Sequence, residues 1–293
     1  MSTVVLLAIT GLGLGGLYFL VASGLSLIYG LMRVLNFAHG AFLTVGAYVG
    51  YQVGTHVGTA SSWPVFALML VVGTATGAGF ALVTELVLVR RLYEREIEQV
   101  LVTVGVGLCA IALVNGIWGA DPRAFPAPGW MSGTTGLLGA DIPNTRLVCI
   151  ATAACVLGGL LALLRWTRHG LIIRAGVENR AMVTALGIDV RRSFTAVFVI
   201  GGAVAGLGGV LAALYNGSVA PGMGDGLLIF AFIVVVIGGL GSIIGSAVAA
   251  LVVAVLQQFT NYYAVSGLGD FTVVLALALV LLVRPRGLFG RPA

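Results

Sequence analysis

The sequence predicts an all-α polytopic membrane protein with about eight to ten transmembrane helices, one of them broken or re-entrant. The chain of 293 residues is 59% hydrophobic and only 9% charged, whereas a soluble domain carries about a quarter charged residues. Several runs exceed the roughly 18 apolar residues typical of a membrane-spanning helix. The 44 glycines are about twice the usual share, which in a membrane indicates close helix packing and broken helices. We therefore expect a single transmembrane domain over residues 1–293.

Nine apolar runs are candidate spans. In chain order they are Val4–Leu31, Ala38–His56, Val65–Val89, Gln99–Trp118, Leu147–Leu164, Phe194–Tyr215, Leu227–Leu240, Ile243–Tyr262 and Ala264–Val283. The first run has no basic region before it and no cleavage pattern after it, so we expect a retained helix rather than a removed signal peptide. In the sixth run small residues repeat every four positions, at Gly201, Ala205 and Gly209. Gly202 and Gly206 repeat alongside them, and two such ridges predict tight helix packing.

The seventh run, Leu227–Leu240, is short for a span, because it covers about 21 Å of a hydrocarbon core about 30 Å thick. It ends in the sequence GGLGS, Gly238 to Ser242, which can break or turn a helix. The run therefore either crosses the membrane or is re-entrant. Backbone exposed at membrane depth survives only where protein or a water-filled cavity covers it, so these glycines form either a simple turn or part of a transport pathway.

The arginines predict the orientation of the chain. Lysine is absent, and thirteen of the fifteen basic residues fall on one side of the predicted membrane. These thirteen are Arg33 and the arginines of segments 90–95, 165–192 and 284–291. Only Arg123 and Arg146 lie on the other side. Because basic loops stay in the cytoplasm, we expect the N-terminus outside and the C-terminus inside, with nine crossings, or seven if the seventh run is re-entrant.

Two connecting loops are long. The outer loop, 119–146, is rich in proline and glycine and carries Trp130; it is either a docking surface for an external partner or an ordered lid. The cytoplasmic loop, 165–192, contains a predicted short amphipathic helix that Gly187 ends. The apolar stripe of this helix consists of Val177, Ala181, Ala185 and Leu186. Such a helix either rests on the bilayer surface or inserts into a groove on a partner protein.

A polar cluster interrupts the apolar sequence in LMRVLNFAHGAF, residues 31–42. Arg33 is expected at the cytoplasmic end of the first span, where Asn36 and His39 turn the chain into the second. These two side chains either cap helix ends or line the inner mouth of a pathway, with Gly40 allowing close backbone approach. A metal site is not expected, because neither of the other two histidines comes near His39 on this topology.

The remaining polar residues within the spans are few. Glu85 lies one to two turns before Arg90 and Arg91, so we expect it to reach the cytoplasmic interface and pair there rather than bind substrate. The cysteines follow no CxxC or metal-binding spacing and are expected to be small core residues. They are Cys109, Cys149 and Cys155.

Five segments in a fixed order carry a resemblance to a known family. They are GLSLIYGLMRVLNFAHGAFLTVGAY, LVTVGVGL…NGIWGADPRAFPAP, RAGVENRAMVTALGIDVRRSFTAVFVIGGAVAGLGGVL, PGMGDGLLIFAFIVVVIGGLGSIIGS and RPRGLFG. Along nearly its whole length the chain resembles the membrane permease subunits of bacterial branched-chain (hydrophobic) amino-acid ABC importers. It departs from many members at Ala41, where they have glutamate, and at Leu86, where they have arginine. Related urea and amide importers use similar permeases, so the departures leave the substrate class open.

The resemblance implies the ABC importer permease fold and a heteromeric assembly in the bacterial cytoplasmic membrane. Its other members would be a second related permease, two ATP-binding subunits and an external substrate-binding protein. The loop 165–192 resembles the family's coupling segment, which contacts the ATP-hydrolysing subunit. The residues so assigned to ATPase coupling are Val177, Glu178, Asn179, Arg180, Ala181, Ala185, Leu186 and Gly187. The candidates for the substrate pathway are Asn36, Phe37, His39, Gly40, Gly238, Gly239, Gly241 and Ser242.

The absence of lysine bears on catalysis. A P-loop needs a lysine after its glycines to reach the phosphates, so we expect no catalytic residues and no bound cofactor here, with ATP and Mg²⁺ used by partner ATPases. A hydrophobic amino acid would suit an apolar pathway in which backbone dipoles meet its charged ends. The scarcity of ionisable residues within the spans argues against proton coupling. The alternatives are a urea or amide importer permease and a self-sufficient channel or secondary carrier.

Overall fold

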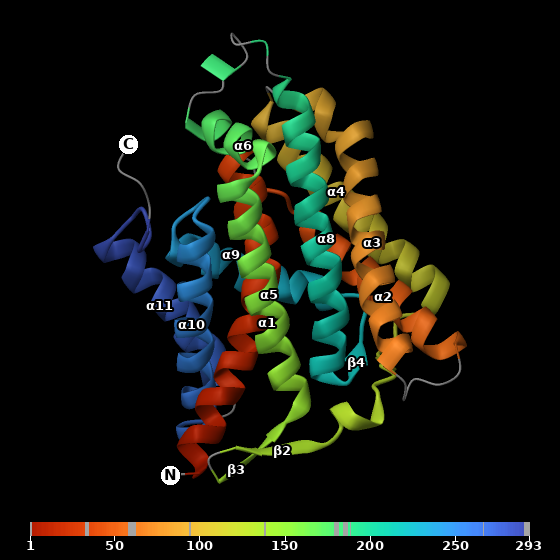
Figure 1. Ribbon diagram of the computed structural model, residues 1–293, viewed down its shortest axis with the longest axis vertical. Helices are drawn as coiled ribbons and strands as arrows, with labels where there is room; N and C mark the ends of the chain where they lie inside the picture. The colour runs from red at the N-terminus through yellow and green to blue at the C-terminus, as the bar shows by residue number, and fades with distance from the viewer. Residues whose placement is uncertain are drawn as a thin grey trace.

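The computed structural model confirms an all-α polytopic membrane protein (Figure 1). It describes residues 2–32, 35–57, 63–93, 95–137, 139–178, 182–183, 187, 189–265 and 267–289. The α-helices are α1 (Ser2–Met32), α2 (His39–His56), α3 (Trp63–Val87), α4 (Glu96–Trp118), α5 (Asn144–Trp166), α6 (Arg168–Glu178), α8 (Val190–Asn216), α9 (Met223–Gly238), α10 (Ile243–Tyr263) and α11 (Leu268–Val283). The short elements are the 3₁₀ helices η1 (Val89–Leu92) and η2 (Gly129–Met131) and the strands β1 (Arg123–Ala124), β2 (Thr134–Leu137), β3 (Ala140–Pro143) and β4 (Ser218–Val219).

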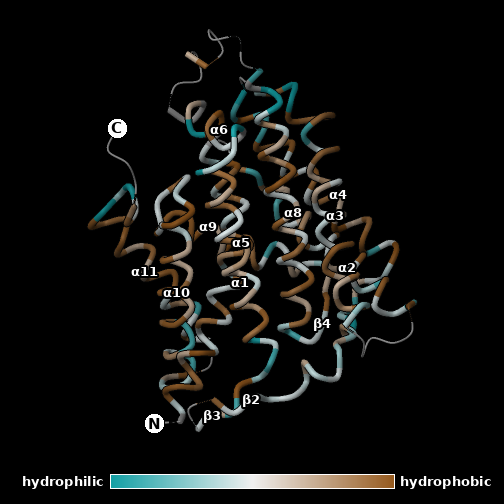
Figure 2. The backbone as a smooth tube through the Cα atoms, viewed as in Figure 1, coloured by the Kyte–Doolittle hydropathy of each residue, from teal (hydrophilic) through white to brown (hydrophobic). Residues whose placement is uncertain are grey.

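Each of the nine predicted runs coincides with one helix. Six of these helices, α1, α3, α4, α5, α8 and α10, are long and apolar enough to cross a membrane by themselves. Helix α2 has 18 residues, and α9 and α11 have 16 each, so these three are shorter. Figure 2 shows hydrophobic residues along most of the helix length, with hydrophilic residues gathered toward the ends of the bundle, notably near α6.

The chain crosses the bundle between β4 and the end of the seventh run. Before it, β4 pairs antiparallel with β1 at the end of the bundle that carries the β-strands (Figure 1). After it, Gly241 packs on Gly30, near the opposite end of α1, where a Cβ on Gly30 would lie 3.2 Å from the Gly241 Cα. The chain therefore passes from one end of the bundle to the other between β4 and Gly241. The N-terminus lies at the strand-bearing end, and α6 lies at the other (Figure 1).

Helix α2 begins deep inside the bundle rather than at its end. The His39 Nε2 donates a hydrogen bond to the carbonyl oxygen of Val21 over 3.0 Å. Val21 precedes Met32, the last residue of α1, by eleven positions, which is about 16 Å along the helix axis. The chain after α1 thus returns toward mid-depth before α2 starts. The expectation that Asn36 and His39 mark the cytoplasmic end of two spans was therefore wrong, because neighbouring helices supply the cover and partners that water would supply at the surface.

Helix α9 also begins at mid-depth, directly against the start of α2. The Gly224 backbone N–H donates to Thr44 Oγ1 over 3.1 Å. A Cβ on Gly40 would lie 2.9 Å from the Gly224 carbonyl oxygen, and a Cβ on Gly224 would overlap the Gly40 carbonyl. The first turns of these helices can touch because both contact positions, 40 and 224, are glycine. The N-terminal ends of α2 and α9 consequently meet inside the bundle.

The small-residue ridges of α8 form the tight contacts that their spacing predicts. A Cβ on Gly201 would lie 2.7 Å from the Ile28 Cδ1 of α1. On the neighbouring ridge, Gly202 and Gly206 face α3, and a Cβ on Gly206 would lie 3.0 Å from the Gly77 Cα. Helix α8 therefore packs backbone against backbone at the centre of the bundle, as expected for membrane helices that associate through close packing.

The described residues of the predicted outer loop, 119–137 and 139–146, fold over one end of the bundle. Strands β2 and β3 form an antiparallel hairpin. Trp130 stacks on Trp63, the first residue of α3, with ring centroids 4.1 Å apart. The Asn144 side-chain amide donates to the Trp130 carbonyl oxygen over 2.7 Å. These contacts hold the loop against the bundle, as expected for a lid. Its use as a docking surface stays a prediction.

Glu85 is buried within the bundle rather than paired at its surface as expected. Its carboxylate is fully buried at the end of α3, where it accepts a hydrogen bond from the Thr195 Oγ1 of α8 over 2.9 Å and another from the Tyr93 hydroxyl. The expected pairing with Arg90 or Arg91 was wrong, because the carboxylate faces α8 and finds hydroxyl donors there. Glu85 thus ties the end of α3 to the start of α8.

The cysteines occupy two kinds of environment. Cys149 is buried, as expected. Cys109 on α4 and Cys155 on α5 are exposed, so their expected place in the core was wrong. Helices α4 and α5 lie at the edge of the bundle, and only 22% and 17% of their most apolar stretches are buried. Small residues on their outer faces therefore remain uncovered.

Candidate functional site

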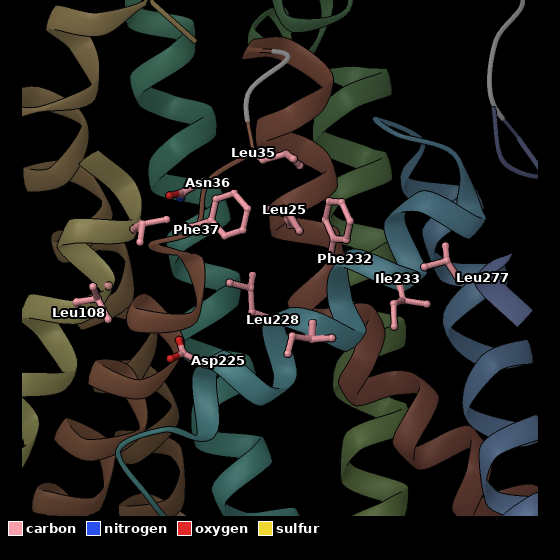
Figure 3. Close-up of a pocket in the computed structure, with 13 residues that line it drawn as sticks. Leu25, Leu35, Asn36, Phe37, Leu108, Asp225, Leu228, Phe232, Ile233 and Leu277 are labelled. Atoms are coloured by element: carbon pink, nitrogen blue, oxygen red, sulfur yellow. The ribbon is translucent and has the colours of Figure 1, made fainter. Parts of the chain in front are cut away.

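A cavity of about 510 Å³ opens where the N-terminal ends of α2 and α9 meet (Figure 3). Helices α1, α4, α9 and α11 and the segment before α2 contribute its walls. The lining residues are Leu25, Leu35, Asn36, Phe37, Val104, Gly107, Leu108, Asp225, Leu228, Ile229, Phe232, Ile233 and Leu277. Two of these have polar side chains, Asn36 and Asp225, and in the view of Figure 3 they lie on the same side of the cavity, one above the other. The cavity is therefore an apolar chamber with two polar groups at mid-depth.

Asn36 is held rigidly by the turn that it forms. Its Oδ1 accepts a hydrogen bond from the Ala38 N–H over 3.1 Å, and its backbone carbonyl accepts one from the His39 N–H over 3.3 Å. The side chain is only 2% exposed, and its Nδ2 has no hydrogen-bond partner among the described residues. Asn36 therefore combines the two predicted alternatives: its amide oxygen supports the start of α2, and the residue is part of the cavity lining.

Asp225 lies in the first turn of α9. Its Oδ1 also lies beside the first turn of α2, because a Cβ on Gly40 would be 3.2 Å from it. The positive ends of two helix dipoles thus lie beside one carboxylate. The sequence-based interpretation did not name Asp225, since it placed the start of this span at Leu227. The available signal was an acidic residue just before an apolar run, as in the first turn of a helix.

The other three candidates from the polar cluster take different places. Phe37 lines the cavity and is 39% exposed. His39 is fully buried and lies outside the lining, where it holds α2 on the Val21 carbonyl. Gly40 provides the contact between α2 and Gly224. His39 and Gly40 therefore position α2 beside the cavity without lining it.

The GGLGS candidates lie apart from this cavity, in the turn between α9 and α10. Gly239 and Gly241 have φ angles of 103° and 82°, which favour glycine. The Ser242 Oγ accepts a hydrogen bond from the Gly245 N–H over 3.0 Å and so caps α10. The Gly238 carbonyl accepts one from the Phe289 N–H over 3.1 Å. These residues form a turn near the end of α1, and their part in a pathway stays a prediction.

The predicted coupling segment falls largely outside the described residues. Helix α6 ends at Glu178, and nothing is described of the side chains of Val177 and Glu178. Gly187 is described and has a φ of 77°, consistent with a turn. The candidates Asn179, Arg180, Ala181, Ala185 and Leu186 lie outside the described residues. The coupling assignment therefore stays a prediction.

Within the described ranges, no three His, Cys, Asp or Glu side chains lie close enough to share a metal ion.

Known proteins similar to this chain cover nearly its whole length. The profile of a family described as the permease component of branched-chain amino acid transport systems matches residues 7–284. The high-affinity branched-chain amino acid transport system permease protein LivH of Escherichia coli K12 is 28% identical over 289 residues, covering 96% of this chain and 94% of that protein. The corresponding protein BraD of Pseudomonas aeruginosa is 29% identical over 293 residues, covering 97% and 95%. The probable permease LivH of Methanocaldococcus jannaschii is 28% identical, covering 92% and 88%. No solved structure matches the chain.

Proposed function

We propose that this chain, which belongs to the family of permease components of branched-chain amino acid transport systems, is the transmembrane permease of an ATP-driven ABC importer and forms a path for branched-chain or other hydrophobic amino acids. The observation that carries the proposal is the cavity at mid-depth. Its walls are apolar, and its volume of about 510 Å³ lies within the range typical of small-molecule sites. An amino acid with an aliphatic side chain matches this combination of an apolar chamber and two polar groups.

The open side of the cavity supports a second permease as partner. Apolar side chains at its rim are strongly exposed: Leu108 on α4 by 64% and Ile229 on α9 by 62%. Such a rim around a transport chamber needs protein on its far side, because an open side would expose the polar groups of the chamber to lipid. A second, related permease would close the chamber and complete the path.

ATP hydrolysis would come from other subunits. The chain contains no lysine, so it cannot build a P-loop. We therefore propose two ATP-binding subunits that use ATP and Mg²⁺, docked at the loop 165–192, and an external binding protein that delivers substrate at the opposite end.

The distribution of arginines supports an orientation in the bacterial cytoplasmic membrane. The loop 165–192 and the segment 90–95 hold most of the basic residues, and Figure 1 places α6, from that loop, opposite the N-terminus. By the rule that basic loops stay inside, the N-terminus would be outside and the C-terminus inside.

Reconstitution tests the proposal. The neighbouring genes that encode a permease, ATPases and a binding protein would be expressed together with this chain. The purified complex would then be placed in liposomes. We expect uptake of radiolabelled leucine that requires ATP and all subunits, and little uptake of urea. Uptake of leucine by the chain alone without ATP would instead identify a channel or secondary carrier. ATP-driven uptake of urea or an amide in place of leucine would identify that class of importer.

A further inference from the structure

We propose that Asp225 and Asn36 bind the two charged ends of the transported amino acid in this cavity. The Asp225 carboxylate accepts hydrogen bonds from the substrate's α-ammonium group, and the Asn36 Nδ2 donates to its α-carboxylate. The proposal rests on the proposed transport function and makes it specific, because it assigns each end of a zwitterion to one side chain.

Asp225 has the charge and the access that an ammonium group requires. It lies in the first turn of α9, and its Oδ1 lies 3.2 Å from where a Cβ on Gly40 would be, beside the first turn of α2. Both helix dipoles stabilise its negative charge. The carboxylate receives no hydrogen bond from the described residues, and it is exposed to the cavity that it lines. A cation with several N–H donors would complete this site.

Asn36 has the donor that a carboxylate requires. Its Oδ1 is occupied by the Ala38 N–H, which fixes the orientation of the amide. The Nδ2 is buried and unpaired among the described residues, although buried polar groups are nearly always hydrogen-bonded. The side chain is only 2% exposed, so bulk water does not satisfy this group. A substrate carboxylate that reaches this group from the cavity would satisfy it.

The rest of the lining fits the third substituent of the substrate. Leu228 and Phe232 come from the same helix as Asp225 and face the chamber with Phe37 (Figure 3). An aliphatic side chain can pack against these groups without leaving a polar atom unpaired. Urea carries no charged ends, so it would leave the Asp225 carboxylate without a counter-ion.

The test uses the complete transporter in liposomes with its own binding protein, which makes delivery of substrate identical for all variants. Asp225→Asn and Asn36→Asp are nearly isosteric, and an aspartate at position 36 can still accept the Ala38 N–H. We expect each to lower ATP-driven leucine uptake at least tenfold, while the complex assembles normally. Asp270→Asn is the matched control, because Asp270 also lies in the first turn of a helix, α11, but outside the cavity; its uptake should stay within twofold of wild type.

The double variant, Asn36→Asp with Asp225→Asn, exchanges the two groups. A zwitterion can bind the exchanged pair in the reverse orientation, so we expect uptake at least threefold above that of either single variant. A purely structural role for either residue predicts an additive loss. Uptake within twofold of wild type in both single variants, or no recovery in the double variant, would overturn the assignment. If the wild-type complex itself does not transport leucine, the proposed function fails instead.

Discussion

His39→Ala is expected to weaken the packing of α2 on α1 rather than to block substrate. The imidazole is fully buried and donates to the Val21 carbonyl oxygen over 3.0 Å. Its ring also meets the edge of Phe42, with centroids 6.2 Å apart. Alanine removes both the hydrogen bond and the ring from the point where α2 starts inside the bundle.

The size of the effect follows from these two losses. A hydrogen bond between membrane helices contributes about 0.6–1 kcal/mol. Removal of a buried ring costs about 2 kcal/mol, near the lower end of the range for large-to-small substitutions, because packing rather than transfer from water holds membrane helices together. The sum is about 3 kcal/mol, or roughly 6 °C in the unfolding midpoint of a chain of this size. His39→Gln keeps a side-chain N–H donor and should lose only about 1 kcal/mol.

Thermal unfolding in lipid nanodiscs measures this directly. His56→Ala is the matched control, because His56 lies in the last turn of the same helix and is exposed, so its midpoint should stay near that of wild type. If His39→Ala unfolds at the wild-type temperature but no longer transports leucine, the imidazole acts on the substrate and does not serve mainly to pack α2 on α1.

Three further outcomes are expected. Gly224→Ala should prevent assembly, since its Cβ would overlap the Gly40 carbonyl, whereas Gly226→Ala, with open space around its Cα, should assemble normally in size-exclusion chromatography. Glu85→Ala should lower the free energy of unfolding by about 3 kcal/mol, because it removes the shared acceptor of two hydrogen bonds and leaves a cavity; Glu85→Gln should cost about 1 kcal/mol, and equal thermal midpoints for both would contradict the hydrogen-bonded role. Ala185→Trp should leave the permease folded but detach the ATPase in a pull-down, and retention of ATPase and full uptake would refute the coupling assignment.

Much of the fold could be predicted because membrane insertion depends on local sequence. The length of an apolar run decides whether a helix can span the bilayer, and all nine runs coincide with helices. The small-residue spacing at Gly201, Gly202 and Gly206 also predicted close contacts, since helical periodicity alone places these residues on two adjacent ridges.

The depth of the site could not be predicted in the same way. The sequence pattern places Asn36 and His39 at the membrane surface, because isolated polar groups are costly inside a bilayer. That cost is removed when distant parts of the chain shield these polar groups from lipid and hydrogen-bond with them. The Val21 carbonyl that receives the His39 hydrogen bond lies 18 residues away, and the Thr44 hydroxyl that receives the Gly224 N–H lies 180 residues away. No local pattern identifies these partners.

The meeting of α2 and α9 at mid-depth also explains why the chamber needs a single carboxylate. Each helix N-terminus carries about half an elementary positive charge, so the two together roughly balance one ionised Asp225. The chamber is then close to neutral, which suits a zwitterion that is itself neutral overall. Without the carboxylate, two uncompensated helix ends would attract anions and repel an ammonium group. The paired glycines at positions 40 and 224 therefore do more than permit packing: they bring two helix ends close to Asp225, and the same contact sets the electrostatic character of the proposed path.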